Sequence, residues 1–152
     1  MNELLAALHD SALATWVRES SSLWAYPMVI TMHTFGLAVL VGASTAVDLR
    51  VLGVGRRIPL TSLHGFFTVM WAGFWLNATT GVLLFAADPR TTGILMIKLL
   101  SVVAGVVFVV LIRRAVIGRG ASSTTPAVKA YAVLSLIAWI VATTTGRLMA
   151  YL

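Results

Sequence analysis

Four polar side chains with distinct chemistry lie inside long apolar stretches of this chain, at His33, Asn77, Lys98 and Arg147. A neutral imidazole can ligate haem iron or relay a proton, while ammonium and guanidinium groups can pair with an anion. A lysine inside an apolar helix costs roughly 2.5–3.5 kcal/mol near the middle of a membrane, and less toward its surface. Lys98 therefore indicates a local role or partner that offsets this cost.

The apolar stretches are long enough to hold these side chains within a membrane. The chain has 152 residues, of which 59% are hydrophobic and 11% are charged. A soluble domain has roughly 25% charged residues, so this composition predicts a membrane protein. We expect an all-α, four-transmembrane-helix bundle that is preceded by an amphipathic interfacial helix and forms one membrane domain. The interfacial helix is predicted at 2–18, and the spans at 23–47, 63–87, 93–112 and 127–150, within a domain covering 1–152.

The positions of the basic residues predict which side of the membrane each connection faces. The first-to-second and third-to-fourth connections, with Lys129 just beyond the latter, hold seven of the eleven Lys and Arg residues. Such connections are normally cytoplasmic, so both termini are predicted to be extracytoplasmic. The expected location is the bacterial cytoplasmic (inner) membrane, with several passes through the lipid bilayer. Because topology accounts for the net charge of +6, nucleic acid is not an expected partner.

This topology brings the four polar residues into one layer of the outer half of the membrane. At a rise of ~1.5 Å per residue, His33 and Asn77 lie ~13 Å below the outer surface and Lys98 lies ~10 Å below it. Arg147 lies within about one turn of that surface. Gly36, one turn along from His33, either lets two helices approach closely or leaves space for a flat ligand.

His33 has three interpretations: a histidine bonded to a neighbouring carbonyl, an axial ligand to haem iron, or a proton relay. The nearby cations Lys98 and Arg147 disfavour a protonated imidazole and so favour a neutral ligand. These two cations would then pair with an anion, such as a haem propionate, a quinone head group or a carboxylate substrate. The candidate cofactor site comprises His33, Lys98, Arg147, Asn77 and Gly36, with His33 as the metal ligand.

The other titratable residues are expected to lie outside this layer. His64 begins the second span, ~20 Å from His33 along the membrane normal, so one haem cannot bridge the two within a chain. The role of His9, on the amphipathic helix, stays open. The five acidic residues are scattered, and none is expected in the core of a span. Asp48 and Arg50 are predicted to form a salt bridge at the end of the first span.

The first span carries a recognisable pattern: a proline, then Thr-x-His-x-x-Gly, a further glycine and Leu-Arg-x-x-Gly at its end. These residues are Pro27, Thr31, His33, Gly36, Gly42, Leu49, Arg50 and Gly53. The pattern resembles a family of small four-span bacterial membrane proteins of uncharacterised function, many of which carry a glutamate where this chain has Ile30. More distantly, the layout is similar to the four-helix haem-binding protoporphyrinogen oxidases and the CopD-type copper-resistance proteins. In those oxidases a first-helix histidine and a third-helix lysine are functional, so the resemblance implies a b-type haem (haem b) on His33 near Lys98.

These observations favour a haem b-binding membrane protein for electron transfer or redox chemistry near the outer leaflet. In this hypothesis His33 is the axial ligand, Lys98 and Arg147 hold propionates or a substrate anion, and Asn77 supplies a hydrogen bond. One alternative is an accessory or structural subunit of a larger membrane complex that has no cofactor of its own. Another is copper handling by outer methionines together with His33. A redox partner or a homo-oligomer is compatible with each hypothesis, and whether the chain is an enzyme stays open.

Overall fold

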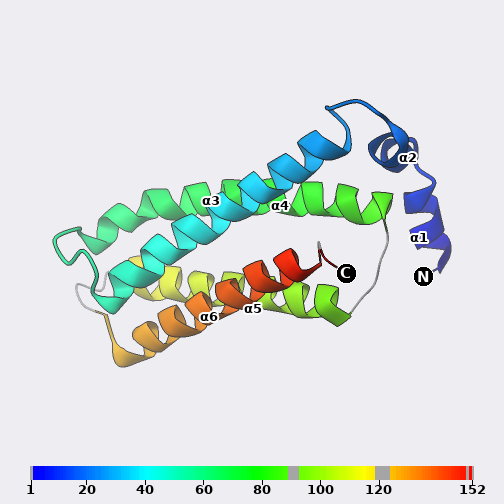
Figure 1. The fold of residues 1–152 in the computed structure, drawn as a ribbon. Coiled ribbons are helices and arrows are strands. Elements are labelled where there is room, and N and C mark those ends of the chain that lie inside the picture. The colour runs from blue at the N-terminus through cyan, green and yellow to red at the C-terminus, as the bar shows by residue number, and fades with distance from the viewer. Residues whose placement is uncertain (1, 89–92, 119–123, 150, 152) are drawn as a thin grey trace. The chain divides into compact units, whose positions relative to one another are not determined.

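The computed structural model describes residues 2–88, 93–118, 124–149 and 151, and within these ranges the regular structure is entirely helical. This confirms the predicted all-α fold with four long apolar helices and short helical structure at the N-terminus. The elements, traced in Figure 1, are α1 (Asn2–His9), α2 (Ala12–Glu19), α3 (Tyr26–Leu52), the 3-10 turn η1 (Leu60–Leu63), α4 (His64–Ala87), α5 (Gly93–Arg113), the π-helical turn η2 (Arg114–Gly118) and α6 (Pro126–Leu148).

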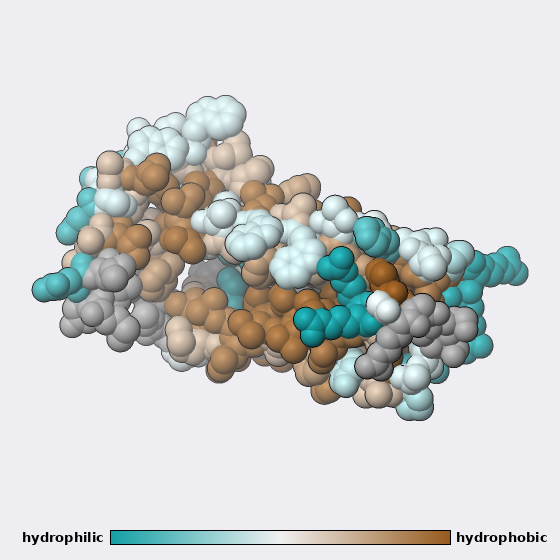
Figure 2. Space-filling model, turned by 180° about the vertical axis from the view of Figure 1, so that it is seen from behind, coloured by the Kyte–Doolittle hydropathy of each residue, from teal (hydrophilic) through white to brown (hydrophobic). Residues whose placement is uncertain are grey.

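Among the residues that the structure describes, four helical segments are long and apolar enough to cross a membrane, and the chain is a multi-pass membrane protein. They cover Tyr26–Leu52, Leu60–Ala87, Gly93–Gly118 and Pro126–Leu148, each with at least 23 residues. At ~1.5 Å per residue each exceeds the ~30 Å thickness of a bilayer's hydrocarbon core. Apolar and near-neutral residues cover most of the helical surface on the face drawn in Figure 2. A lipid environment accounts for this exposure, because lipid tails solvate side chains that water would not.

The N-terminal segment, predicted as one helix over 2–18, consists of two helices that are separated at Ser11. The Ser11 hydroxyl accepts a hydrogen bond from the Ala14 backbone N–H at 3.3 Å and donates one to the Leu8 carbonyl at 2.7 Å. A serine that accepts such a bond begins a new helix, because it satisfies a backbone donor that has no partner within that helix. The sequence prediction of a single helix overlooked this N-cap.

The chain divides into two compact units, each containing part of α3 and part of α4. The first unit comprises Met1–Leu40 and Trp71–Arg90, and the second comprises Val41–Met70 and Thr91–Leu152. In the first unit, the start of α3 and the end of α4 approach closely at two glycines. A Cβ atom on Gly36 would lie 2.7 Å from the Asn77 backbone nitrogen, and one on Gly73 would lie 2.7 Å from that of Leu40. Only residues without side chains allow the two backbones to approach this closely.

In the second unit, α5 and α6 lie side by side (Figure 1) and contact each other through a glycine and a tryptophan. A Cβ atom on Gly105 would lie 2.8 Å from two atoms of the Trp139 indole ring. Trp139 is only 1% exposed, and it is the largest fully buried side chain in the described part of the chain. The indole ring therefore occupies the space that a side chain at position 105 would need.

The connection that follows α3 is a compact turn stabilised by Arg50. Its guanidinium group donates hydrogen bonds to the carbonyl oxygens of Ile58 at 2.6 Å and Arg56 at 3.3 Å. Gly53 and Gly55 have φ angles of 110° and 64°, which L-residues with side chains rarely adopt. Because Arg50 bonds to these carbonyl groups and Asp48 forms no ion pair among the described residues, the predicted Asp48–Arg50 salt bridge was wrong.

Candidate functional site

His33 contacts α4 through its imidazole ring in the first unit. Its Nδ1 lies 3.0 Å from the Asn77 carbonyl oxygen and 3.2 Å from the Thr80 hydroxyl oxygen. A carbonyl oxygen only accepts hydrogen bonds, so this geometry assigns the ring hydrogen to Nδ1. A Cβ atom on Gly81 would lie 3.1 Å from His33 Cε1, so the glycine makes room for the ring. The backbone of α4 therefore sets the tautomer and the position of the imidazole.

The Asn77 side chain links the same two helices in the opposite direction. Its Nδ2 donates to the His33 carbonyl oxygen at 2.8 Å, which is the shortest of its contacts with His33. The same nitrogen lies 3.3 Å and 3.4 Å from the two ring nitrogens of His33. An atom almost equally distant from both nitrogens does not lie along the in-plane lone pair of either one. Asn77, which is buried, thus bonds to the backbone of α3 and lies against the imidazole ring.

Lys98 lies against α6 in the second unit. A Cβ atom on Gly146 would lie 3.4 Å from Lys98 Cε and 3.5 Å from its Nζ. The ammonium group is therefore next to the backbone that immediately precedes Arg147. A glycine at this position lets the lysine stem lie along the helix, so the cationic end approaches the C-terminal end of α6. Carbonyl groups at a helix C-terminus favour a positive charge.

Arg147 is exposed near the end of α6. Its guanidinium carbon lies 5.6 Å from the centre of the Tyr151 ring, within the range of a cation–π contact. The two residues also line a surface hollow of about 370 Å³, together with Thr143, Thr144 and Leu148. An arginine held over an aromatic ring keeps its N–H groups available at the ring edge, where an anion can approach.

The structure thus brings the predicted site residues together as two separate groups. His33, Asn77 and Gly36 lie together in the first unit, while Lys98 lies beside the Gly146–Arg147 segment in the second. Gly36 contacts the α4 backbone, which gives it the close-packing role that was one of its two interpretations. A common layer that combines both groups stays a prediction. His64 is exposed at the start of α4.

Sequence reasoning missed Asp48, which is completely buried in the second unit. No residue that the structure describes forms a hydrogen bond with either carboxylate oxygen. The first span was predicted to end at 47, before Asp48, but α3 continues to Leu52, so Asp48 lies inside the last turns of this helix. Helical spacing was the available signal: Asp48 follows Ser44 by four residues and precedes Val51 by three, and both of these are buried.

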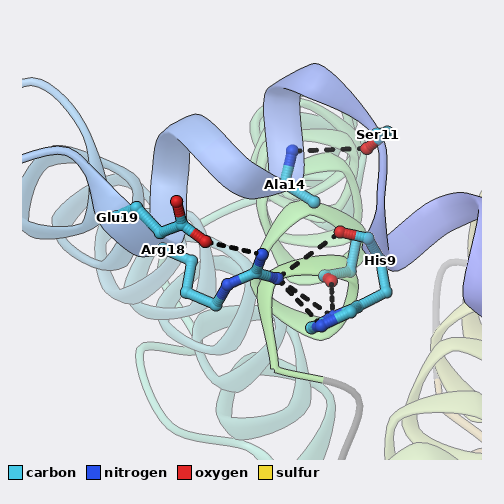
Figure 3. Close-up of polar contacts among 6 residues, drawn as sticks. His9, Ser11, Ala14, Arg18 and Glu19 are labelled. Carbon is cyan, nitrogen blue, oxygen red and sulfur yellow. Dashed lines mark hydrogen bonds and ion pairs between the residues drawn. The ribbon is translucent and has the colours of Figure 1, made fainter.

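His9, whose role the sequence left open, joins a polar cluster at the N-terminal helices (Figure 3). Its Nδ1 lies 3.2 Å from the Ala86 carbonyl oxygen near the end of α4. Arg18 Nη1 lies 3.0 Å from His9 Nε2, and Arg18 Nη2 forms a 3.0 Å ion pair with Glu19. With the ring hydrogen on Nδ1, His9 donates to Ala86. Arg18 Nη1, which also lies 3.1 Å from Nδ1, is almost equally distant from both ring nitrogens, so it lies against the ring and donates to the His9 carbonyl oxygen at 3.4 Å. The cluster therefore attaches α1 and α2 to the end of α4 within the first unit.

Substituting Arg18 by alanine is expected to loosen this attachment. The substitution removes the donor to His9 and the ion pair with Glu19, both of which are partly exposed. Exposed polar contacts of this kind contribute roughly 0.2–1 kcal/mol each, so global unfolding should change little. Backbone amide exchange in residues 2–19 should accelerate several-fold, while exposed Arg57→Ala should leave it unchanged. Equal exchange in both variants would contradict a structural role for the cluster.

The described residues hold no group of three or more His, Cys, Asp or Glu side chains that could together bind a metal ion. Any metal bound through His33 would therefore need further ligands from a cofactor or another residue type. Comparison of the chain with models of protein families, with curated proteins and with solved structures found no match. Functional inference consequently depends on the geometry above.

Proposed function

We propose that this protein binds a b-type haem in the outer half of the bacterial cytoplasmic membrane and serves electron transfer or redox chemistry there. The observation that supports this proposal is the fixed imidazole of His33. Its Nδ1–H donates to the Asn77 carbonyl at 3.0 Å, so Nε2 is the ring nitrogen that carries the lone pair. Histidines that ligate metals commonly have this arrangement, in which the second ring nitrogen bonds to a carbonyl or carboxylate group.

The donor set of the chain fits a haem in three respects. His33 Nε2 would supply the axial ligand, and the Asn77 carbonyl and Thr80 hydroxyl would hold the ring orientation. Lys98 and Arg147 belong to the other unit, and they are proposed to pair with the propionates only from their predicted depth near the outer surface. Haem bound in this way would supply a one-electron redox centre. Electron transfer would then need a redox partner, either within a membrane complex or as a second copy of this chain.

An absorption spectrum of the purified protein tests the proposal directly. After expression with ample haem, wild-type protein should show a Soret band that shifts on reduction. His33→Ala should lose at least about nine-tenths of the bound haem, because loss of the axial nitrogen removes the bond to iron. His64→Ala, a matched control at an exposed histidine, should retain it.

Two results would contradict haem binding at this site. One is a wild-type protein that is colourless after haem loading. The other is equal loss of the Soret band in the His33 and His64 variants. A colourless chain that co-purifies with a stable membrane partner would instead favour an accessory subunit without its own cofactor.

A further inference from the structure

A second buried polar cluster lies in the second unit, away from the residues used above. Asp48 on α3 and Ser135 on α6 are 0% exposed, and Trp139, one turn further along α6, is 1% exposed. Both carboxylate oxygens of Asp48, the Ser135 hydroxyl and the Trp139 indole nitrogen have no hydrogen-bond partner among the residues that the structure describes. We call Asp48 and Ser135 the Asp48 cluster. Buried polar groups without partners are uncommon, and each one needs a physical explanation.

The two helices direct complementary groups toward one another. The Ser135 hydroxyl faces the Asp48 carboxyl group closely enough to interact with it, without reaching the geometry of a hydrogen bond. A hydroxyl can donate to an ionised carboxylate or accept from a protonated carboxylic acid, so Ser135 can serve either state. The Trp139 indole N–H can only donate, so it cannot ligate a cation.

Charged groups near the ends of these helices have other partners or are exposed. Arg50, two residues after Asp48, donates to the carbonyl groups of the following turn, and Arg113 lies 5.9 Å from the Phe67 ring centre. Lys129, on α6, is exposed, and the Tyr131 ring stacks on Phe108. Among the residues described, Arg18 and Glu19 form the one ion pair, so Asp48 has no cationic partner there.

An ionised carboxylate that is buried without a cation or hydrogen bonds is strongly unfavourable, and binding a proton removes this cost. A metal cation would need several oxygen ligands, whereas a proton needs one carboxylate. We propose that Asp48 is a proton-binding site, with its carboxyl group exchanging one proton with water. The exchange is R–COOH + H₂O ⇌ R–COO⁻ + H₃O⁺, and a small approach of the Ser135 hydroxyl would let it accept from the acid or donate to the carboxylate.

The position of Asp48 along α3 provides a short route for this proton. Asp48 lies four residues before the helix ends at Leu52, which corresponds to ~6 Å along the axis. The turn that follows is exposed at Arg56 and Arg57. Water at this end of the helix therefore needs to penetrate by only about one turn to reach the carboxyl group. The proton-binding site does not depend on haem, because none of its residues belongs to the proposed haem site.

Infrared spectroscopy of the full chain in lipid vesicles, combined with carbodiimide labelling, tests the proposal. As the pH is raised, the carbonyl band of a protonated carboxylic acid should disappear with a single midpoint. Asp48→Asn, which preserves the shape of the side chain, should abolish this band, and Asp10→Asn at an exposed carboxylate should not. Dicyclohexylcarbodiimide should modify wild-type Asp48 at the acidic end and several-fold less at the alkaline end.

The labelling uses wild-type protein, so it does not depend on whether a variant folds. Absence of both the infrared band and the label at every pH would overturn the proposal, as would a band or label that does not vary with pH. Protection from the label by Na⁺ at constant pH would instead identify a cation site and would also overturn the proposal.

Ser135→Ala should shift the infrared midpoint by up to about one pH unit, whereas Ser101→Ala should not. The Ser101 hydroxyl donates to the Ile97 carbonyl of its own helix. An unchanged midpoint in the Ser135 variant would exclude the assigned role of this hydroxyl.

Discussion

Replacing Trp139 by alanine is expected to lower the free energy of unfolding by about 3–5 kcal/mol, the range for truncating a buried aromatic side chain. The indole ring is 1% exposed and lies against Gly105, where no side chain can move in to replace it. The resulting cavity would lie between α5 and α6, which contact each other along their lengths. Unfolding by sodium dodecyl sulfate in mixed micelles, followed by far-ultraviolet circular dichroism, measures this loss.

Trp75→Ala is the matched control for this prediction. Trp75 is 62% exposed on α4, so truncation there creates no enclosed cavity, and the expected change is within about 1 kcal/mol. Trp139→Phe should lose less than Trp139→Ala because it retains a ring. Loss of the indole N–H should lower the free energy of unfolding only slightly, since that group has no hydrogen-bond partner among the described residues. Similar losses for Trp139→Ala and Trp75→Ala would contradict the interpretation of Trp139 as the centre of the α5–α6 contact.

The fold was predictable because long apolar runs constrain a membrane protein strongly. A run of about 20 apolar residues can satisfy its backbone in lipid only as a helix or within a closed barrel, so composition and run length predicted the four helices. The ends were less predictable. α3 continues to Leu52 rather than ending at 47, and its last turn contributes the buried side chain of Val51. A charged residue near the end of an apolar run does not by itself indicate where the helix ends.

The proximity of His33 and Asn77 was predictable, but the orientation of their side chains was not. Counting residues from the span ends placed His33 and Asn77 at similar depths, and the structure has them in contact. The same counting could not reveal that the Asn77 main chain, rather than its side chain, accepts from the imidazole Nδ1. Backbone carbonyl groups are present at every position, so sequence patterns do not distinguish the ones that bind side chains.

Pairing opposite charges by proximity in the sequence failed at Asp48 for a related reason. Arg50 is only two residues away, but positions i and i+2 of a helix point in different directions. The glycines at 53 and 55 allow a turn whose carbonyl groups meet the guanidinium group, and this alternative partner depends on backbone conformation. Proximity in the sequence to Arg50 therefore did not indicate the burial of Asp48, whereas its helical spacing from Ser44 and Val51 did.

The close approach of α3 and α4 leads to a second prediction of large effect. Replacing glycine by alanine should change the free energy of unfolding in opposite directions at two positions of α3. Gly36→Ala should lower the free energy of unfolding by about 1–3 kcal/mol, because its Cβ would lie 2.7 Å from a backbone nitrogen that cannot move independently. Gly42→Ala should raise it by about 0.5–1 kcal/mol, since position 42 is exposed, has no neighbouring atoms within 4 Å, and alanine favours the helix.

Both variants can be measured by the same detergent-induced unfolding, and their difference in sign separates packing from helix propensity. A stabilising effect at both positions would show that the α3–α4 contact does not form as described. Because the Gly36 contact involves the backbone nitrogen of Asn77, separating the helices there should also lengthen the Asn77–His33 bonds. Gly36→Ala should therefore weaken the binding of any ligand that depends on the orientation of His33, even if residue 36 does not touch that ligand. Gly42→Ala should leave the binding of that ligand unchanged. Loss of stability without loss of such binding would mean that His33 keeps its orientation without this helix contact.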